Sequence, residues 1–590
     1  MITHSIGVED PSAHLYRVTL TVPRPAARQR LSLPVWIPGS YLVREFARHL
    51  SALEARQGRR RILLEQIDKT TWVAACEGRG ALRLSYLVYA FDTSVRAAYL
   101  DPSRGFFNGT SMCLRAEGFE ARPQRLVLRS LPRGWEVATT LPALAVNAAG
   151  RGSYQAADYD ELVDHPVEMG RFWRGRFVAC GIAHEFVVAG ALPDFDSARL
   201  LTDVQRLCEQ EIGFWHPRAG PRARIDLKQL PFRRYLFMLN AVDEGHGGLE
   251  HRSSTALIAP RRNLPRNGDA GSSDGYVSLL GLIAHEYFHS WNVKRMRPAQ
   301  FQSLDYAREN YTELLWFFEG FTSYYDDLTL VRSSMIDAER YLGLLGKTIN
   351  NVLATPGRQV QSVAQASFDA WTKYYRADEN TPNATISYYA KGSLVALALD
   401  LTLRAGRTGT LDDVMRHLWR TSRGGPISRA DIGAALRSVG RRSFEKELTA
   451  WVDGVRELPL QDLLQSFGVE WQVRPATLAQ RLGVRLNESA LTGIKVTHVL
   501  RGGVAQQAGL AAGDEIIGLG AWRLRRLDDA LRLFEPGREA PLLVARDQRI
   551  MTLKLLVPKL ADRDNATVTL RVAAKAPRTA FGLRQAWLSG

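Results

Sequence analysis

The sequence predicts a multidomain α+β protein, and three patterns along its 590 residues indicate this class. Alternating apolar and polar residues, as in residues 15–22 and 82–89, dominate the first 180 residues and indicate β-strands. Apolar runs of helical character dominate residues 271–475. Short β-like runs separated by glycines return in residues 476–560. A chain of this length can form several domains, each with its own core.

The N-terminal residues 1–180 are expected to form a β-sandwich. Turn residues, as in residues 23–25 and 132–134, separate the alternating runs. Residues 181–270 then mix the two kinds of element. Residues 197–214 are typical of a helix and residues 235–239 of a strand, and a polar loop over residues 261–274 precedes the helical part.

A metal-binding pattern occupies residues 285–289, where two histidines stand four positions apart in the order H-E-x-x-H. The preceding apolar residues 276–284 predict a helix, which Ser273 or Asp274 can cap. Residues four apart on a helix share one face, so His285 and His289 can both reach one ion. Glu286, rotated by about 100°, can reach a water molecule on that ion. Zinc suits this set, since it accepts imidazole nitrogen and can keep one position open for water.

A third metal ligand is expected in the apolar and aromatic residues 314–327. Glu319 lies in the middle of this run, and a carboxylate is costly to bury unless a partner such as a divalent cation compensates it. Asp326 follows about two helical turns later on nearly the same face, where it can accept a hydrogen bond from a ligand histidine. The alternative is that Glu319 faces solvent at a helix end, with Gly320 as the break.

Two further segments fit peptide chemistry. Gly247 and Gly248 precede Glu250, and paired glycines allow backbone to approach a bound peptide closely. Tyr388 and Tyr389 open an apolar helix, and a tyrosine at a helix mouth can donate a hydrogen bond to a developing oxyanion. Spacing alone does not separate these two tyrosines. Paired glycines also form ordinary turns, and paired tyrosines also pack half-buried.

In this order the segments resemble the gluzincin aminopeptidases, and most closely the glycyl aminopeptidase family, family sixty-one of the metallopeptidases, whose members carry a C-terminal PDZ domain. Residues 285–295 are similar to that family's zinc segment and residues 33–46 to its N-terminal domain. The resemblance implies a thermolysin-like catalytic domain over residues 181–475, one Zn²⁺ per chain, and a preference for glycine or another small residue. It assigns His285, His289 and Glu319 as zinc ligands, Glu286 as general base, Glu250 as the site of the substrate amine, and Tyr389 as oxyanion donor.

The chain departs from the larger, better-known aminopeptidase family at two positions. Phe318 precedes the expected ligand Glu319 where that family commonly has Asn, and His251 replaces the Asn that closes its exopeptidase motif. These departures concern the role of Glu250 more than the zinc ligands. We expect His246 and His251 to line the cleft rather than bind metal.

Residues 476–560 resemble a PDZ domain, specifically at residues 508–510 and 513–516. Such domains add a peptide strand to a sheet edge and hold its C-terminal carboxylate with loop amides. The expected carboxylate loop consists of Leu482, Gly483 and Val484. The alternative is a PDZ fold that serves only packing. Residues 561–590 are set apart as a C-terminal tail.

Composition narrows the partners and the compartment. The net charge of +16 comes from 77 basic and 61 acidic residues, but the basic runs at 59–61 and 523–526 are short and no nucleic-acid recognition motif accompanies them. We therefore expect no nucleic-acid partner. No apolar stretch reaches the length of a membrane span, and the first residues lack the pattern of a secretory signal. The four cysteines are widely spaced, which favours reduced thiols and a cytoplasmic location: Cys76, Cys113, Cys180 and Cys208.

The sequence therefore predicts a zinc-dependent aminopeptidase for peptides with a free amino terminus, with a peptide or protein C-terminus as a possible ligand of the PDZ-like module. A zinc endopeptidase is one alternative; it keeps every zinc residue and discards only the role of Glu250. A peptide-binding scaffold with a structural zinc is another. A structural site is usually closed by a fourth protein ligand, and no Cys or His near these segments is an obvious candidate.

Overall fold

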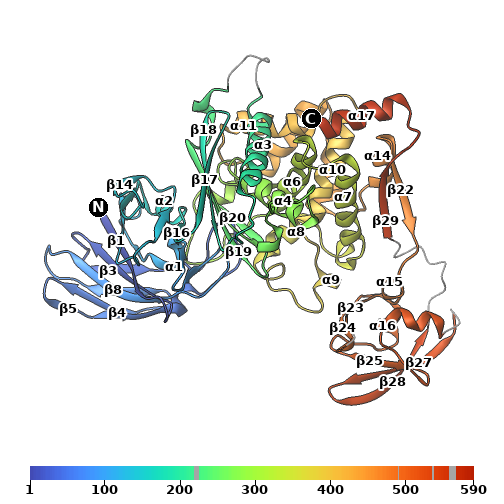
Figure 1. Cartoon of the computed structure of the whole chain (residues 1–590), viewed down its shortest axis with the longest axis horizontal. Coiled ribbons are helices and arrows are strands. Elements are labelled where there is room, and N and C mark those ends of the chain that lie inside the picture. The colour runs from blue at the N-terminus through green and yellow to red at the C-terminus, as the bar shows by residue number, and fades with distance from the viewer. Residues whose placement is uncertain (218–224, 490, 534–536, 557–566) are drawn as a thin grey trace. The chain divides into compact units, whose positions relative to one another are not determined.

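The structure is a computed structural model that describes residues 1–217, 225–489, 491–533, 537–556 and 567–590 (Figure 1). The chain forms two compact units. Met1–Tyr311 together with Trp419–Ile427 make the first, and Thr312–Leu418 together with Ser428–Gly590 make the second.

The N-terminal part of the first unit is built from β-sheets. One sheet has eight strands in the order β14-β15-β12-β1-β2-β8-β4-β5, and two have four, in the orders β13-β16-β10-β9 and β11-β3-β7-β6. The strands are β1 (Ile2–Asp10), β2 (Leu15–Val22), β3 (Arg28–Ser32), β4 (Leu50–Gln57), β5 (Arg60–Ile62), β6 (Leu64–Gln66), β7 (Thr71–Ala75), β8 (Leu82–Tyr89), β9 (Ala98–Leu100), β10 (Arg104–Phe107), β11 (Arg115–Ala116), β12 (Gln124–Arg129), β13 (Glu136–Ala138), β14 (Ala143–Val146), β15 (Gly152–Ala156) and β16 (Val167–Gly170). Short helices connect them: η1 (Phe46–His49), α1 (Gly109–Met112) and α2 (Tyr159–Val163).

The alternation seen in the sequence sets the core of this part. In β2 every second side chain is buried, and β8, which pairs antiparallel with β2, follows nearly the same rhythm. Because successive strand residues point to opposite faces, the buried residues of both strands face one core. The prediction of a β-rich N-terminal domain is confirmed.

A five-stranded sheet follows in the first unit and carries the first site residues. Its order is β17-β18-β19-β21-β20, with β18, β19 and β21 parallel and the two outer strands antiparallel to their neighbours. Every residue of β21 is buried, as expected for a strand covered on both faces. The strands are β17 (Trp173–Ala179), β18 (Ile182–Ala189), β19 (Arg234–Val242), β20 (Gly247–Glu250) and β21 (Ser254–Pro260). Gly247, Gly248 and Glu250 lie on β20, which is an edge strand of this sheet.

Helices accompany this sheet. They are α3 (Ser197–Trp215), η2 (Leu227–Gln229), η3 (Arg261–Asn263), α4 (Asp274–Phe288) and η4 (Ala299–Phe301). Helix α4 packs against β20 and β21, so the H-E-x-x-H residues lie beside the edge strand.

The second unit begins at Thr312, within the predicted helical residues 271–475, whose first helix, α4, belongs to the first unit. Its helices are α5 (Leu315–Phe318), α6 (Gly320–Arg332), α7 (Ala338–Leu353), η5 (Pro356–Gln359), α8 (Val363–Phe368), η6 (Asp369–Trp371), α9 (Thr381–Ala384), α10 (Ala390–Ala405), α11 (Leu411–Ser422), α12 (Arg429–Gly440), α13 (Glu445–Leu448), η7 (Thr449–Asp453) and α14 (Leu460–Ser466). Helix α10 is buried along almost its whole length and packs against α6. The predicted helical character of this region is confirmed.

The C-terminal residues rejoin these helices. Strand β22 (Val469–Arg474) pairs antiparallel with β29 (Thr567–Val572), and helix α17 (Arg578–Ser589) follows. The indole Nε1 of Trp587 donates a hydrogen bond to the hydroxyl of Tyr324 on α6 at 2.9 Å, and Arg404 on α10 donates to the Ala586 carbonyl at 2.7 Å. Residues 567–590, expected as part of a tail, are thus a strand and a packed helix; residues 561–566 lie outside the described residues.

The PDZ-like module lies between β22 and β29. Its sheet runs β23-β24-β25-β27-β28, with β26 paired to β25, and it has a core of its own. The elements are α15 (Leu478–Leu482), β23 (Val484–Ser489), β24 (Gly493–Val499), α16 (Val504–Gln507), β25 (Glu515–Leu519), β26 (Trp522–Arg523), η8 (Leu527–Arg532), β27 (Glu539–Arg546) and β28 (Arg549–Leu556). Leu482 ends α15, Gly483 turns the chain with φ +73°, and Val484 begins the edge strand β23.

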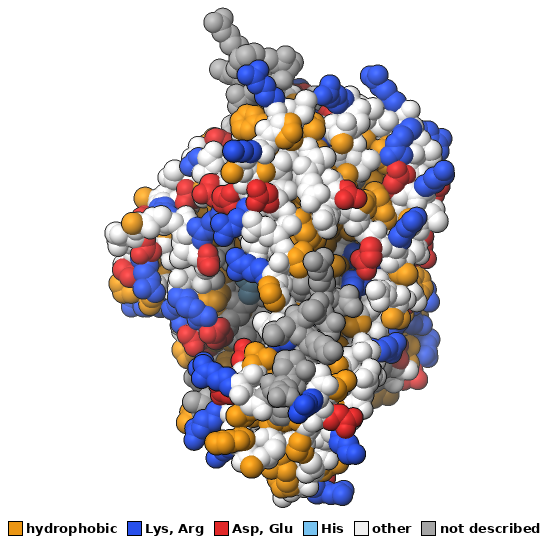
Figure 2. Space-filling model, turned by 90° about the vertical axis from the view of Figure 1, so that its right-hand side faces the viewer, with side chains coloured by type: hydrophobic (Ala, Val, Ile, Leu, Met, Phe, Trp, Pro, Cys, Tyr) orange, Lys and Arg blue, Asp and Glu red, His pale blue; other side chains and the backbone are white. Residues whose placement is uncertain are grey.

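Surface charge is distributed rather than concentrated on the face in Figure 2, where Lys and Arg side chains alternate with acidic and apolar ones. Among the helices of the described residues, none combines the length and the apolar character that a membrane crossing needs.

Candidate metal centre and active site

The geometry of α4 orients the two histidines. Its N-cap is Ser273, whose hydroxyl accepts a hydrogen bond from the Tyr276 amide at 3.1 Å; of the two predicted caps, the serine is therefore the one used. The rings of His285 and His289 lie one turn apart, with centroids 4.7 Å from each other. His289 Nδ1 lies 2.8 Å from the Asn292 carbonyl oxygen, which can only accept. Nδ1 therefore carries the proton, which leaves Nε2 to bind a metal.

His285, His289 and Glu319 form one cluster of possible ligands. Each offers one ligand atom, and these atoms all lie within 4.8 Å of one another. In the part of the chain that the structure describes, no other group of three His, Cys, Asp or Glu side chains meets this criterion. Two imidazole nitrogens and one carboxylate are a donor set that zinc accepts while keeping a position for water. The residues present therefore fit this metal.

The Glu286 carboxylate lies against the edge strand. A Cβ atom placed on Gly248 would be only 2.1 Å from Glu286 Oε1, so any side chain at position 248 would displace this carboxylate. The glutamate is almost fully buried. The backbone of β20 and the carboxylate of the H-E-x-x-H segment are thus direct neighbours.

Glu250, at the end of β20, is a buried carboxylate without a partner. The residue is 4% exposed, and no hydrogen bond or ion pair joins its carboxylate to any other described residue. A Cβ atom on Gly39 would lie 2.5 Å from both Glu250 oxygens, and Gly39 has φ +93°. Burying an unpaired carboxylate is costly, so this arrangement favours a cationic ligand.

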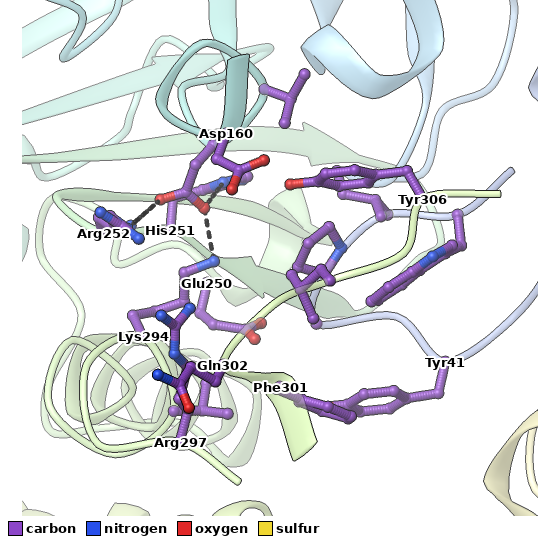
Figure 3. A pocket seen from close by; sticks show the side chains of 18 residues that line it. Tyr41, Asp160, Glu250, His251, Arg252, Lys294, Arg297, Phe301, Gln302 and Tyr306 are labelled. Atoms are coloured by element: carbon purple, nitrogen blue, oxygen red, sulfur yellow. Dashed lines mark hydrogen bonds and ion pairs between the residues drawn. The ribbon is translucent and has the colours of Figure 1, made fainter. Parts of the chain in front are cut away.

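A cavity opens beside Glu250 in the first unit (Figure 3). Glu250, Asp160 and Tyr306 line it together with the aromatic rings of Tyr41 and Phe301, which stack with centroids 5.9 Å apart. Several charged side chains complete the lining: Asp164, Arg252, Lys294 and Arg297.

The two tyrosines lie at the start of α10, where a pair of glycines lets this helix touch the segment that carries Glu319. A Cβ atom on Gly320 would be 2.6 Å from Gly392 Cα, and one on Gly392 would be 2.6 Å from the Trp316 carbonyl oxygen. Burial raises the pKa of both Tyr388 and Tyr389 well above the usual value, and the charge of Glu319 raises it further.

The two tyrosines differ in exposure. Tyr388 is fully buried, whereas Tyr389 is partly exposed and its hydroxyl lies 3.2 Å from that of Tyr375. Tyr389 is therefore the more accessible donor of the pair.

Comparisons with known proteins agree with the geometry. Family models match residues 3–171 (Peptidase M61 N-terminal domain), 278–395 (M61 glycyl aminopeptidase) and 470–529 (PDZ domain). The solved structure of an aminopeptidase N family protein from Idiomarina loihiensis is 36% identical, with a TM-score of 0.92 over 100% of both chains. The chain belongs to the M61 glycyl aminopeptidase family.

The M61 enzyme is a zinc metalloaminopeptidase, which confirms the predicted family and enzyme class. An M1 zinc metallopeptidase from Deinococcus radiodurans is also similar, with 17% identity and a TM-score of 0.46 over 78% of this chain and 94% of that chain. A search of the curated proteins found no match.

Several neighbours of the M61 site were not predicted from the sequence. Gly39 makes room for Glu250; it lies in residues 33–46, which supported the family resemblance without a function of their own. Arg96 donates a hydrogen bond to the Gly248 carbonyl at 3.0 Å. Tyr375 belongs to a second tyrosine pair, at residues 374–375, and its hydroxyl contacts that of Tyr389. The repeated Tyr-Tyr pattern is the sequence feature that could have indicated Tyr375 as a neighbour of the site.

Proposed function

We propose that this enzyme removes the N-terminal residue, glycine or another small residue, from peptides with a free amino terminus. One Zn²⁺ per chain would be held by His285, His289 and Glu319. The clustering of these three side chains supports the metal site. The preference for a small residue is supported by the family alone. The unpaired, buried carboxylate of Glu250 is the observation that carries the aminopeptidase assignment.

Glu250 would bind the substrate ammonium. A cation supplies the charge that this buried carboxylate lacks, and a charge-assisted hydrogen bond contributes about 1.5–3 kcal/mol. Because Glu250 ends the strand that runs past Glu286, an amine held there places the first peptide bond near the reacting groups. An internal segment of a longer peptide has no ammonium to offer, which is why this feature favours an aminopeptidase over the endopeptidase alternative.

The edge strand would also align the substrate backbone. Extended peptides add to open sheet edges through main-chain hydrogen bonds, and Gly247 and Gly248 let the peptide come close. The Gly248 carbonyl already accepts a hydrogen bond from Arg96. The part of this short edge that remains for a peptide is therefore small, which agrees with recognition of one chain end.

Glu286 would act as the general base. Zinc, when bound, would lower the pKa of a coordinated water toward about 7 and polarise the scissile carbonyl. Glu286 would accept the proton of the attacking water and pass it to the leaving amine nitrogen. Asp326 would accept a hydrogen bond from a ligand histidine and so fix its ring.

Tyr389 would stabilise the oxyanion of the tetrahedral intermediate by donating its hydroxyl proton in a hydrogen bond. Burial, together with the charge of Glu319, raises its pKa well above the usual value, so the hydroxyl stays protonated at neutral pH. Its partial exposure favours it over Tyr388.

The PDZ module would bind a peptide or protein C-terminus. The family match and the open edge at β23 support this role. Leu482, Gly483 and Val484 would form the carboxylate loop, with Gly483 in the left-handed conformation that turns the chain into the edge strand.

The decisive experiment compares Glu250→Ala on a free peptide and on its N-acetylated form. We expect kcat/KM for the free peptide to fall about 10- to 100-fold, the equivalent of one lost charge-assisted hydrogen bond. The slow cleavage of the acetylated peptide should change little, because it has no ammonium to lose.

Glu244→Ala is the matched control. Glu244 is an exposed acid just before the same strand, and it forms an ion pair with Arg262. Equal losses on the free and the acetylated peptide in Glu250→Ala would favour the endopeptidase instead.

A further inference from the structure

We propose that Asp164 is a positioning residue that fixes both the turn after Glu250 and the loop that orients His289. The inference rests on the proposed roles of Glu250 as amine site and His289 as zinc ligand. Asp164 follows helix α2 of the N-terminal β part, far from both residues in the sequence.

Asp164 is nearly buried, and its carboxylate lies next to three cationic or polar residues: Lys294, Arg252 and His251. Its Oδ1 lies 2.6 Å from Lys294 Nζ, and the side chains of Asp164 and Lys294 are only 12% and 9% exposed. Its Oδ2 accepts a hydrogen bond from the Arg252 backbone amide at 3.0 Å. Its Oδ2 also lies 3.7 Å from Arg252 Nε. Figure 3 labels both cationic residues, Lys294 and Arg252, in the lining of the cavity.

The first contact fixes the turn that follows Glu250. The chain reverses between β20 and β21, and the His251 amide donates to the Ser254 carbonyl at 2.9 Å. Within this turn the Arg252 amide points to Asp164, and His251 Nδ1 lies 3.5 Å from the same carboxylate. Glu250 directly precedes these anchored residues, so the turn fixes the position of the Glu250 backbone from which the carboxylate extends.

The second contact fixes the loop after the zinc helix. The Lys294 amide donates to the His289 carbonyl at 3.0 Å, while His289 Nδ1 donates to the Asn292 carbonyl at 2.8 Å. Between them Val293 has φ 138°, a conformation that is costly for a β-branched residue and persists only where its surroundings impose it. The Lys294–Asp164 ion pair is such a constraint, because it draws the next residue inward.

The charge of Asp164 is stable over the working pH range. Burial acts to raise its pKa, but the charge of Lys294 and the neighbouring side chains of His251 and Arg252 outweigh burial, and the pKa lies well below the usual value. Asp164 therefore stays ionised at neutral pH and holds both segments continuously. A neutral side chain of the same shape removes this hold without opening a cavity.

The test is Asp164→Asn, measured by zinc affinity and by substrate preference. We expect zinc affinity in competition with a chelator to fall about 10- to 100-fold, the range seen when groups that orient metal ligands are changed. We also expect the preference for a free over an N-acetylated peptide, the ratio of their kcat/KM values, to fall about tenfold, since Glu250 loses its fixed turn.

Glu168→Gln is the matched control. Glu168 is likewise a buried acid of the N-terminal part, paired with Arg104 at 2.8 Å, but it contacts neither segment. This variant should lower the unfolding temperature and keep both zinc affinity and amine preference. If Asp164→Asn behaves in the same way, Asp164 serves stability alone and the proposal is overturned.

Lys294→Gln separates the effect of Asp164 on the loop after the zinc helix from its effect on the turn after Glu250. It also replaces Asp164→Asn if that variant does not fold. It should lower the zinc affinity more than it lowers the preference for a free amino terminus, because Lys294 belongs to the loop after the zinc helix. Unchanged zinc affinity would overturn the proposal that Asp164 fixes this loop.

Glu250→Ala, measured alongside, separates this proposal from the proposed function. If Glu250→Ala keeps the amine preference, the amine site itself is wrong; if it abolishes the preference and Asp164→Asn keeps it, only the positioning role is wrong.

Discussion

Two glycines make room for the two carboxylates of the site, and each does so from a different element. Gly248 on β20 faces Glu286, and Gly39 from the N-terminal β part faces Glu250. In both cases a single methyl group would overlap the carboxylate oxygens. Glycine is favoured at both positions because a larger residue would collide with a carboxylate. At Gly39 the positive φ is a second, conformational reason.

Gly248→Ala tests this fit at the residue scale. The new methyl would start 2.1 Å from Glu286 Oε1, so the carboxylate must move. We expect kcat to fall by about two orders of magnitude or more, the usual contribution of a positioned general base. Zinc content, measured by elemental analysis, should remain at the wild-type value. Glu286→Gln gives the reference loss, and a Gly248→Ala variant with wild-type kcat would remove the steric argument.

Helices α6 and α10 meet at Gly320 and Gly392, and this crossing places Glu319 beside the tyrosine pair. Without side chains at the crossing, the backbones approach so closely that a Cβ on either glycine would touch the other helix or the Trp316 carbonyl. The electrostatic effect of Glu319 on Tyr388 and Tyr389 is a direct result of this proximity.

Gly392→Ala tests the crossing at the element scale. Its Cβ would lie 2.6 Å from the Trp316 carbonyl and 3.0 Å from Gly320 Cα, so the helices must separate. We expect a lower unfolding temperature and weaker zinc binding, read by thermal melts and chelator competition. Gly343→Ala on α7 is the control: nothing lies within 4 Å of its Cβ, and replacing a helical glycine there should stabilise by about 0.5–1 kcal/mol. Equal behaviour of the two variants would contradict the close crossing.

At the scale of the whole molecule, buried histidines make stability depend on pH. Burial lowers the pKa of His4, His165 and His184 to about 4. The unfolded chain would protonate them near pH 6.5, whereas the folded chain keeps them neutral down to about pH 4. Between these limits the unfolded state binds more protons, so stability falls as the pH falls.

Thermal unfolding measured from pH 7 to pH 4 tests this dependence. The unfolding temperature should decrease steadily below about pH 6.5, with each of the three histidines contributing on the order of 3 kcal/mol by about pH 4. His184→Gln should flatten part of the slope, because glutamine does not titrate. An unfolding temperature that is constant across this range would contradict the buried neutral state.

The sequence predicted those parts of the site that local patterns encode. His285, Glu286 and His289 follow from helical spacing, and Glu319 follows from the cost of burying a carboxylate in an apolar run. Gly39, Asp164 and Lys294 did not stand out, because their roles arise only when distant segments meet at Glu250. Helix α17 was missed for a similar reason: its packing depends on contacts of Trp587 and Ala586 with α6 and α10, which no pattern within the last residues reveals.

The β22–β29 pair has a practical consequence for engineering. Arg474 and Thr567 are paired partners, so the PDZ module departs and returns at neighbouring points of one ribbon. A stop codon ahead of the module would therefore also delete α17 and strip Trp587 from Tyr324. Deleting the module and joining the two strands by a short loop would instead keep α17 in place. The same junction is also a suitable site for inserting a foreign domain.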